Sequence, residues 1–362
     1  MTDVIHSKAY RLIEPGKFKE TIIEHKVKEG EVVVQPILAS ICHADLRYYT
    51  GKRRKEALNQ KLPMALFHEG IGEVVISKDE FIQVGQKVAI VPSIPGYRLE
   101  QKKKEDCCES CRRNVADNYC KTGVFLGSGY DGIGQEFLVL PSENVVPIPE
   151  KLKDEIAVLA ELCSVSLHAL NHLKEEDFHK GKIAVFGDGP VGYLTAAMLY
   201  HYFHIPKSQL LVFGAVEEKL NQFDFATVHL VNDFPFLEAK GVTVAIECTG
   251  GKFSESAINQ AIDLLEPEGK LILMGVTEQR VPINTRDVLE KGLQLYGSSR
   301  SSSEDFKTLM QAFLNEDYQK TLSKLIPEKS IAIRNAEDLK KAMDEAAEHK
   351  GWKKTYLSFS WN

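Results

Sequence analysis

Three residues in the N-terminal part of the chain carry side chains that bind zinc in proteins. They are Cys42 and the adjacent pair His68-Glu69. Thiolate, imidazole and carboxylate groups are all zinc ligands. Cys42 and His68 are too far apart in sequence for a zinc finger, so a shared site would have to be assembled by the fold. The spacing alone shows only possible ligands.

A second group of possible metal ligands lies in a charged segment, residues 102–120, which interrupts a series of short β-like runs. The segment holds Cys107, Cys108, Cys111 and Cys120. The N-terminus has no basic stretch followed by an apolar core, so we expect no signal peptide and predict a cytoplasmic location. In that reducing compartment, metal ligands or buried thiols are favoured over disulfides.

A glycine-rich turn, Gly187-Asp188-Gly189-Pro190-Val191-Gly192, follows the apolar run 182–186 and precedes a helical apolar pattern over 193–203. This order of strand, turn and helix is typical of dinucleotide-binding sites. Gly187 makes the turn, Gly189 lets the backbone approach a pyrophosphate, and Gly192 lets the helix pack closely on the strand. The helix N-terminus then offers free N–H groups to the phosphates. The alternative is a glycine turn that binds no nucleotide.

The bulk composition limits the classes of partner. The chain has 362 residues, which is too long for one ordinary core and predicts two domains. The net charge of −6 gives no general attraction to nucleic acid or to an anionic membrane. No apolar run approaches the ~20 residues that span a bilayer. We therefore expect a small-molecule substrate, no nucleic acid and no membrane.

Two patterns of elements divide the chain. Residues 7–39 alternate as short strands with turns, and further β-like runs follow. From residue 182 onward, apolar strands alternate with helical patterns, which predicts a parallel, doubly wound sheet. The predicted fold class is α/β. A mainly β domain covers 1–153, with 299–362 returning to it, and a Rossmann dinucleotide-binding domain covers 154–298.

The chain resembles the zinc-dependent medium-chain dehydrogenase/reductase family over nearly its whole length. The residues that carry the resemblance are Cys42 with Asp45, His68-Glu69 with Gly72, the cysteine-rich segment, Asp131-Gly132, Glu161 with His168-Ala169, the glycine turn and Glu247-Cys248-Thr249-Gly250-Gly251. The resemblance implies that the mainly β catalytic domain is GroES-like and that the possible ligands meet in one cleft.

A narrower resemblance is to the ribulose-5-phosphate reductases, which make ribitol 5-phosphate for teichoic acid or capsule synthesis. It rests on longer runs at 47–51, 61–64, 68–70, 284–292 and 297–300. The cysteine-rich segment departs from that subfamily, which leaves open a divergent branch with a different polyol substrate.

This resemblance implies a catalytic zinc with four ligands: Cys42, His68, Glu69 and Glu161. One of the two glutamates would exchange with water and open a position for substrate. The zinc would polarise the substrate ketone while hydride arrives from the nicotinamide. Asp45 is expected to orient His68 through its other ring nitrogen.

Two residues near these ligands depart from the family pattern. Ala44 stands where the family often has a Ser or Thr that relays a proton. Another group must therefore protonate the alkoxide: water on one of the glutamates, or a nearby tyrosine or histidine. Phe67 replaces the usual glycine before His68, and its type suggests no function.

Many family members also bind a structural zinc through four cysteines. Cys108 and Cys111 fit that spacing, and Cys120 follows. The position of the first ligand falls on Glu105, but Cys107 would serve instead if the loop shifted. We predict a structural zinc on the four cysteines of this segment. The alternative is a loop with free thiols.

The resemblance places Gly214 where NAD-dependent enzymes have an acid that binds the ribose 2′-hydroxyl. Without that carboxylate a 2′-phosphate is not repelled, and Lys219 is close enough in sequence to pair with it. NADPH is therefore the predicted cofactor. Glu217 and Glu218 argue against this, since either could face the ribose, but acids also suit the exposed first turn of a helix.

Three arginines are candidates to bind a substrate phosphate, because arginine forms bidentate contacts with phosphate. They are Arg47, Arg53 and Arg300, whereas Lys52 and Lys55 are interpreted as part of a solvated turn. The predicted reaction is the NADPH-dependent reduction of D-ribulose 5-phosphate to D-ribitol 5-phosphate, by a homodimer or homotetramer. The alternatives are a polyol or secondary-alcohol dehydrogenase that acts on an unphosphorylated sugar, and a non-catalytic NADP-binding structural or regulatory protein.

Overall fold

The computed structural model describes residues 3–114, 117–348 and 351–361. The chain forms two compact units, each with its own sheets. One comprises Met1–Ser164, Arg300–Asn315 and Ile326–Asn362, and the other comprises Val165–Ser299 and Glu316–Leu325.

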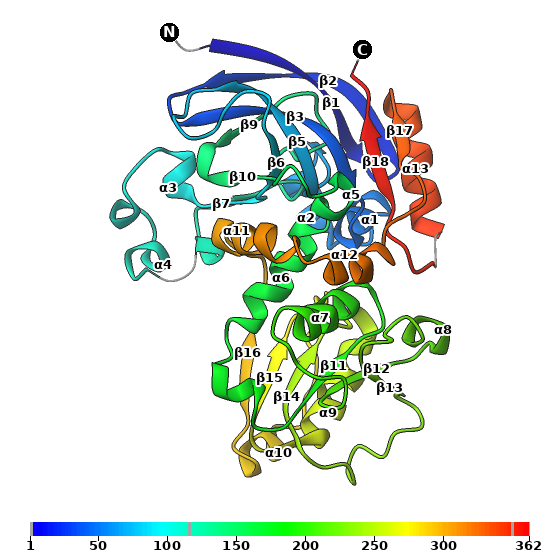
Figure 1. The fold of residues 1–362 in the computed structure, drawn as a ribbon. Helices are drawn as coiled ribbons and strands as arrows, with labels where there is room; N and C mark the ends of the chain where they lie inside the picture. The colour runs from blue at the N-terminus through cyan, green and yellow to red at the C-terminus, as the bar shows by residue number, and fades with distance from the viewer. Residues whose placement is uncertain (1–2, 115–116, 349–350, 362) are drawn as a thin grey trace. The chain divides into compact units, whose positions relative to one another are not determined.

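The first unit is built on mainly antiparallel sheets. The larger sheet has the order β10 (Val145–Pro147), β6 (Lys87–Ile90), β5 (Glu69–Ser77), β3 (Glu31–Ser40), β18 (Tyr356–Phe359) and β17 (Ile331–Ile333), and β9 (Leu138–Pro141) also pairs with β3. The smaller sheets are β2 (Lys17–Val27), β1 (Asp3–Glu14) and β4 (Met64–Ala65), and the pair β7 (Ser93–Ile94) and β8 (Val124–Phe125). Strand β18 lies beside β3 (Figure 1), so early and late parts of the chain share one sheet.

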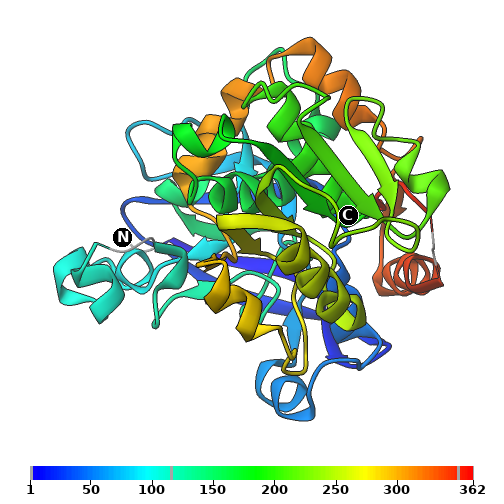
Figure 2. The same cartoon turned by 90° about the horizontal axis from the view of Figure 1, so that it is seen from below.

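Short helices join these strands. They are α1 (His43–Tyr49), α2 (Lys55–Lys61), α3 (Gly96–Leu99), η1 (Lys104–Asp106), α4 (Glu109–Arg112), η2 (Asp117–Tyr119), η3 (Ser142–Asn144), α5 (Asp154–Ala157), α11 (Ser303–Ala312) and α13 (Ala336–Glu348). The segment that holds α3 and α4 stands out from the sheets of this unit, as Figures 1 and 2 show. It contains the four clustered cysteines, and we call it the cysteine lobe.

The second unit is a parallel sheet with the order β13 (Thr227–Leu230), β12 (Leu210–Gly214), β11 (Lys182–Phe186), β14 (Val242–Glu247), β15 (Leu265–Leu273) and β16 (Gln294–Gly297). The central strands β11 and β12 are buried at nearly every position, as expected for a parallel sheet covered on both faces. Its helical elements are η4 (Glu175–Phe178), α7 (Pro190–His201), α8 (Glu217–Leu220), η5 (Gly251–Phe253), α9 (Ser254–Leu264), α10 (Thr285–Glu290) and α12 (Glu316–Ser323).

The division into units differs from the sequence prediction at two places. The first break falls inside α6 (Ala160–Leu170) and not at 153, because that helix continues from one unit into the other. Residues 316–325 belong to the second unit although we expected all of 299–362 to return to the first. Helix α12 packs there because Tyr318 stacks on His201 with ring centroids 5.2 Å apart.

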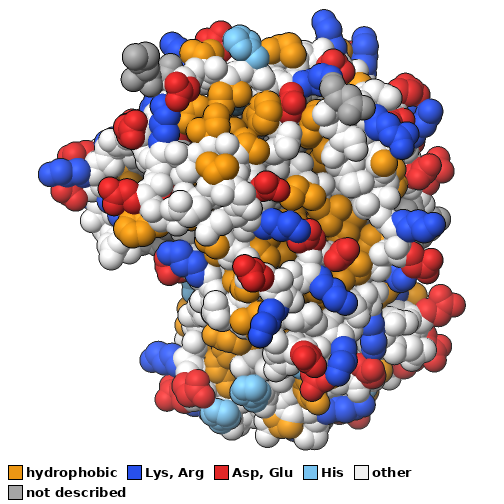
Figure 3. All heavy atoms as spheres, turned by 45° about the horizontal axis from the view of Figure 1, so that its top comes forward, with side chains coloured by type: hydrophobic (Ala, Val, Ile, Leu, Met, Phe, Trp, Pro, Cys, Tyr) orange, Lys and Arg blue, Asp and Glu red, His pale blue; other side chains and the backbone are white. Residues whose placement is uncertain are grey.

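The helices and the surface charges agree with what the composition predicts. No helix in the described residues is long and apolar enough to cross a membrane. On the face shown in Figure 3, acidic and basic side chains are interspersed.

Candidate active site

The register of two strands brings Cys42, His68 and Glu69 together. Strand β3 pairs with β5 so that Ser40 lies opposite Glu69, and Cys42 follows two residues later as the N-cap of α1. One ligand atom from each of Cys42, His68 and Glu69 lies within 4.8 Å of the other two. The fold therefore assembles the shared site that the spacing of these residues left open.

Asp45 joins the two segments that carry these side chains. It is completely buried, and its Oδ2 accepts a hydrogen bond from the backbone N–H of Cys42 at 2.9 Å. Its Oδ1 accepts one from the backbone N–H of Phe67 at 3.2 Å and lies 3.7 Å from His68 Nδ1. Burial lowers the pKa of His68, but the charges of Asp45 and Cys42 outweigh it and hold that pKa well above its ordinary value.

Phe67 has a backbone conformation that glycine would adopt at lower cost. Its φ is +75°, in the left-handed region, which costs a non-glycine residue about 1–3 kcal/mol. Its side chain is completely buried and its ring lies 6.4 Å from that of Phe359. The departure from glycine noted in the sequence thus places a core aromatic beside His68, in a strained conformation that packing maintains.

Lys354 is a member of this group that the sequence analysis missed. Its Nζ lies 2.8 Å from Glu69 Oε2 and donates to the carbonyl oxygen of Ile41 at 3.0 Å. Both side chains of the pair are buried, with exposed fractions of 8% and 1%. Burial would raise the pKa of Glu69, yet the Lys354 ammonium holds it below its ordinary value. No local sequence pattern marks Lys354 as a partner of Glu69, because only the fold brings these two residues together.

Glu161 lies in the first turn of α6 and is 5% exposed. It is outside the group of atoms that meet within 4.8 Å, although His68 and Glu69 are among the charged groups that act on it. Burial raises the pKa of the Glu161 carboxyl to about 7. Its role as a fourth ligand stays a prediction.

The chemistry of this donor set fits zinc. One thiol, one imidazole and one carboxylate converge, a combination that zinc binds. Glu69 Oε1 is buried and has no hydrogen-bond partner in the described part of the chain. Such orphaned atoms are costly unless something else satisfies them. Because Nδ1 faces Asp45, the His68 atom left for a metal is Nε2.

The cysteine lobe also fits a metal. The Sγ atoms of Cys107, Cys108, Cys111 and Cys120 lie within 4.8 Å of one another. Three of the pairs are 3.7–3.8 Å apart, close to the ~3.8 Å between sulfurs on a tetrahedral zinc with bonds of ~2.3 Å, and far beyond a disulfide bond. Backbone N–H groups of Gly96 and Lys121 point at the Cys120 and Cys108 sulfurs at 3.3 Å.

The structure places Cys107, and not Glu105, in the cluster of cysteines that could bind the structural zinc. Cys107 is buried within the cluster. The Glu105 side chain is 71% exposed and lies 3.9 Å from Lys103. The loop is therefore shifted relative to the family spacing, as the alternative with Cys107 requires.

The glycine turn has the geometry that its sequence predicts. Gly187 has a φ of +133°, and Gly189 is the N-cap of α7 with open space where a Cβ would lie. A Cβ on Gly192 would lie 2.0 Å from the carbonyl oxygen of Gly187. Pro190 occupies the first turn, where its missing N–H costs nothing, and Val191 accepts a hydrogen bond from Thr195 Oγ1 at 2.8 Å.

Position 214 at the end of β12 is a glycine, as the sequence analysis noted, but a carboxylate from the glycine turn lies nearby. Asp188 Oδ2 accepts hydrogen bonds from the backbone N–H groups of Ala215 and Val216, at 2.7 and 2.8 Å. A Cβ on Gly214 would lie 2.6 Å from the Asp188 Cβ, so no side chain fits at 214 while Asp188 stays. Lys219 is half-buried and forms no ion pair with a described residue, whereas Glu217 and Glu218 are exposed.

Two of the three candidate phosphate-binding arginines lie over aromatic rings, and the rings differ. The guanidinium Cζ of Arg53 lies 4.8 Å from the centre of the Tyr48 ring. That of Arg300 lies 5.1 Å from the Phe125 ring, and its Nη1 donates to the carbonyl oxygen of Asn118 at 3.5 Å. Arg47 is half-buried in the last turn of α1. The structure therefore supplies more than one candidate environment for a phosphate.

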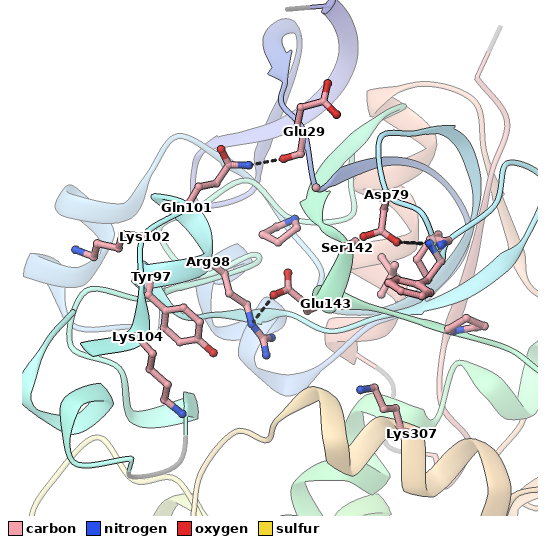
Figure 4. A pocket seen from close by; sticks show the side chains of 16 residues that line it. Glu29, Asp79, Tyr97, Arg98, Gln101, Lys102, Lys104, Ser142, Glu143 and Lys307 are labelled. Carbon is pink, nitrogen blue, oxygen red and sulfur yellow. Dashed lines mark hydrogen bonds and ion pairs between the residues drawn. The ribbon is translucent and has the colours of Figure 1, made fainter. Parts of the chain in front are cut away.

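A separate cavity of about 850 Å³ lies between the cysteine lobe and the sheet (Figure 4). Its basic residues are already paired, since Arg98 lies near Asp117 and Glu143, and Lys104 lies 2.8 Å from Asp117. None of the predicted site residues lines it within the described chain. We assign it no function.

Comparison with known proteins identifies the family. A family model described as the alcohol dehydrogenase GroES-like domain matches residues 28–150, and one described as zinc-binding dehydrogenase matches residues 212–315. Ribulose-5-phosphate reductase 1 of Staphylococcus aureus is 39% identical over 359 residues, which cover 98% of this chain and 99% of that protein. This chain belongs to the family of zinc-dependent medium-chain dehydrogenases that contains the ribulose-5-phosphate reductases.

Other members of the family agree in both sequence and structure. Ribulose-5-phosphate reductase of Bacillus spizizenii is 37% identical over 361 residues, 98% of this chain and 99% of that protein. The crystal structure of S. aureus TarJ in complex with NADPH matches with a TM-score of 0.81 at 34% identity, covering 98% of this chain and 100% of that one. The predicted fold class, with a GroES-like and a Rossmann domain, and the predicted membership of the zinc-dependent dehydrogenases are confirmed.

Proposed function

We propose that this protein reduces D-ribulose 5-phosphate to D-ribitol 5-phosphate with NADPH and a catalytic zinc. The observation that carries the proposal is the agreement of ribulose-5-phosphate reductases over nearly the full length at 37–39% identity, together with the convergence of Cys42, His68 and Glu69. A binding-only protein would not need that buried donor set. The product would serve teichoic acid or capsule synthesis.

The proposed reaction assigns a role to each residue of the site. Cys42, His68 and Glu69, with Glu161 as the fourth candidate, hold a zinc that polarises the ketone oxygen when bound. Asp45 fixes the His68 ring and the Cys42 backbone, and so keeps the imidazole aimed at the metal position. Because Ala44 has no hydroxyl, the proton for the product alkoxide comes through water at Glu69 or Glu161. The glycine turn binds the cofactor pyrophosphate at the start of α7.

The same proposal includes a structural zinc on the cysteine lobe, a cytoplasmic location and a homodimer or homotetramer. All seven cysteines are free of disulfides, which fits a reducing compartment. Analysis of the purified protein should find two zinc ions per chain. One zinc per chain would leave one of the two clusters without a metal.

A panel of ketoses tests the proposed reaction. Purified, zinc-loaded enzyme should oxidise NADPH with D-ribulose 5-phosphate at a kcat/KM about 10- to 150-fold above that with D-ribulose, because one charge-assisted contact to phosphate is worth about 1.5–3 kcal/mol. D-Fructose 6-phosphate and D-fructose complete the panel as a second pair with and without a phosphate. A preference for unphosphorylated sugars would favour the polyol dehydrogenase alternative, which D-xylulose reductase of Saccharomyces cerevisiae represents at 27% identity.

Cofactor selection gives a further expected result. Asp188→Asn should strengthen NADPH binding relative to NADH by about tenfold, because the amide oxygen still accepts from residues 215 and 216 while a negative charge is removed near the ribose. Fluorescence titration of both cofactors measures the ratio.

Gly214→Asp is the matched comparison for that variant. Its Cβ would meet Asp188, so it should weaken the binding of both cofactors. An unchanged ratio in Asp188→Asn would remove Asp188 from cofactor selection.

A further inference from the structure

The second unit contains a buried acid that the proposed reaction does not use. Glu247 is the last residue of β14 and is completely buried. It begins the run Glu247-Cys248-Thr249-Gly250-Gly251, which carries part of the family resemblance. Its contacts within the described chain are hydrogen bonds from neighbouring loops, with no ion pair among them. A buried carboxylate is costly unless such donors satisfy it.

Five donors converge on the Glu247 carboxylate. Its Oε1 accepts hydrogen bonds from the backbone N–H groups of Thr249 and Gly250, at 2.8 and 3.1 Å, and from the hydroxyl groups of Thr249 and Ser254. Its Oε2 accepts one from the backbone N–H of Gly275 at 3.0 Å. Thr249 and Gly250 belong to the loop after β14, whereas Gly275 belongs to the loop after β15. One side chain therefore ties together the loops that follow two neighbouring strands.

The two loops pack closely around this carboxylate. A Cβ on Gly275 would lie 2.4 Å from Glu247 Oε1 and 2.6 Å from the backbone nitrogen of Gly250, so a side chain at 275 would displace the carboxylate. The backbone N–H of Gly251 donates to the carbonyl oxygen of Val276 at 3.0 Å, which joins the same loops a second time. The position of each loop thus depends on the other.

The strand order relates these loops to one half of the cofactor. In the order β13-β12-β11-β14-β15-β16, the direction in which strands are added reverses between β11 and β14, which lie side by side (Figure 1). Folds with this order bind a dinucleotide across the carboxyl ends of the strands, one mononucleotide to each half of the sheet. The half with β11 and β12 carries the glycine turn and the end of β12, where such folds bind the pyrophosphate and the adenosine ribose. The half that begins with β14 is left for the nicotinamide nucleotide.

We propose that Glu247 is a positioning residue that holds the loops after β14 and β15 in the conformation that receives the nicotinamide nucleotide of NADPH. Because Glu247 is completely buried, it acts on the cofactor only through the backbone of these loops. This inference rests on the part of the proposed function that concerns NADPH and not on the identity of the sugar.

Calorimetric titration with two ligands tests this role. Adenosine 2′,5′-bisphosphate represents the adenosine part of NADPH with its 2′-phosphate and lacks the nicotinamide nucleotide. Glu247→Ala should weaken NADPH binding by about tenfold or more and leave the bisphosphate within about twofold of wild type, because only the nicotinamide half loses its support. Glu247→Gln should lose less, since its amide oxygen still accepts from Thr249 and Gly250 while its NH₂ group cannot accept from Gly275.

A second variant disturbs the same contact with Glu247 in place. Gly275→Ala would displace the carboxylate and should also weaken NADPH selectively. Asp177→Asn is the matched control. Asp177 is a buried acid of the same unit that pairs with Lys270, which lies opposite the first residue of β16 and so away from the carboxyl ends of the strands. This variant should lower the thermal stability without changing the ratio of the two affinities.

The titrations contain no sugar, so their outcome is independent of the proposed reaction. If D-ribulose 5-phosphate is not reduced but NADPH binding is lost selectively, the proposed function fails and the role of Glu247 stands. Equal losses for the two ligands in both Glu247→Gln and Gly275→Ala would show that Glu247 supports the whole unit and would overturn the proposal. Unchanged NADPH binding in both variants would overturn it as well.

Discussion

Cys42→Ala should remove one zinc per chain and lower kcat/KM by about a thousandfold or more, equivalent to at least ~4 kcal/mol of transition-state stabilisation. His68→Ala should have the same effect. NADPH binding should survive, because the glycine turn at 187–192 belongs to the second unit, with its own sheet and core. Metal analysis, steady-state kinetics and fluorescence titration of NADPH measure the three quantities separately.

Cys163→Ala is the matched control for that experiment. This thiol is completely buried in the first unit but lies outside both groups of possible metal ligands found in the described chain. It should keep its zinc and its activity. Full activity and unchanged zinc in Cys42→Ala would exclude Cys42 as a ligand, and loss of NADPH binding would mean that the substitution unfolds the protein.

Lys354→Met should lower the free energy of unfolding by about 3–5 kcal/mol, because it leaves the Glu69 carboxylate buried without its partner. Urea denaturation measures this cost. It should be larger in protein stripped of zinc with a chelator than in loaded protein, since a bound dication also compensates the charge of Glu69. Lys354→Arg keeps the positive charge and should recover part of the stability.

The neighbouring lysine provides a direct control for Lys354. Lys353 also pairs with a glutamate, Glu328, at 3.7 Å, but the two side chains are 45% and 88% exposed. Exposed ion pairs contribute about 0–1 kcal/mol to stability. Lys353→Met should therefore leave the free energy of unfolding nearly unchanged. Equal costs at 353 and 354 would show that burial of the Lys354–Glu69 pair has no special role.

The parts of the site that could be predicted from the sequence are those determined by residues close together in the chain. Gly187, Gly189 and Gly192 have the backbone geometry that their spacing implies, because a tight strand-to-helix turn depends on neighbouring residues only. The choice between Glu105 and Cys107 needed the structure, because it depends on how a short irregular loop packs. Cys42, His68 and Glu69 were recognised through a family resemblance, and their convergence follows from the pairing of β3 with β5.

The residues that were missed act over long sequence separations. Lys354 reaches Glu69, and Asp188 reaches the turn after β12. Each is a common surface residue type with no local periodicity to mark it. Helix α12 was assigned to the wrong unit for the same reason, since its contact with α7 depends on tertiary packing of Tyr318 and Tyr193.

The placement of β18 between β3 and β17 constrains the order in which the protein folds during synthesis. Every residue of the second unit is synthesised before β17, α13 and β18. The nucleotide-binding unit therefore has all of its core available while the first unit still lacks a central strand. Until Tyr356 pairs with Ser40, Lys354 is absent and the Glu69 carboxylate stays in water. The metal centre is thus among the last parts of the nascent chain to become buried.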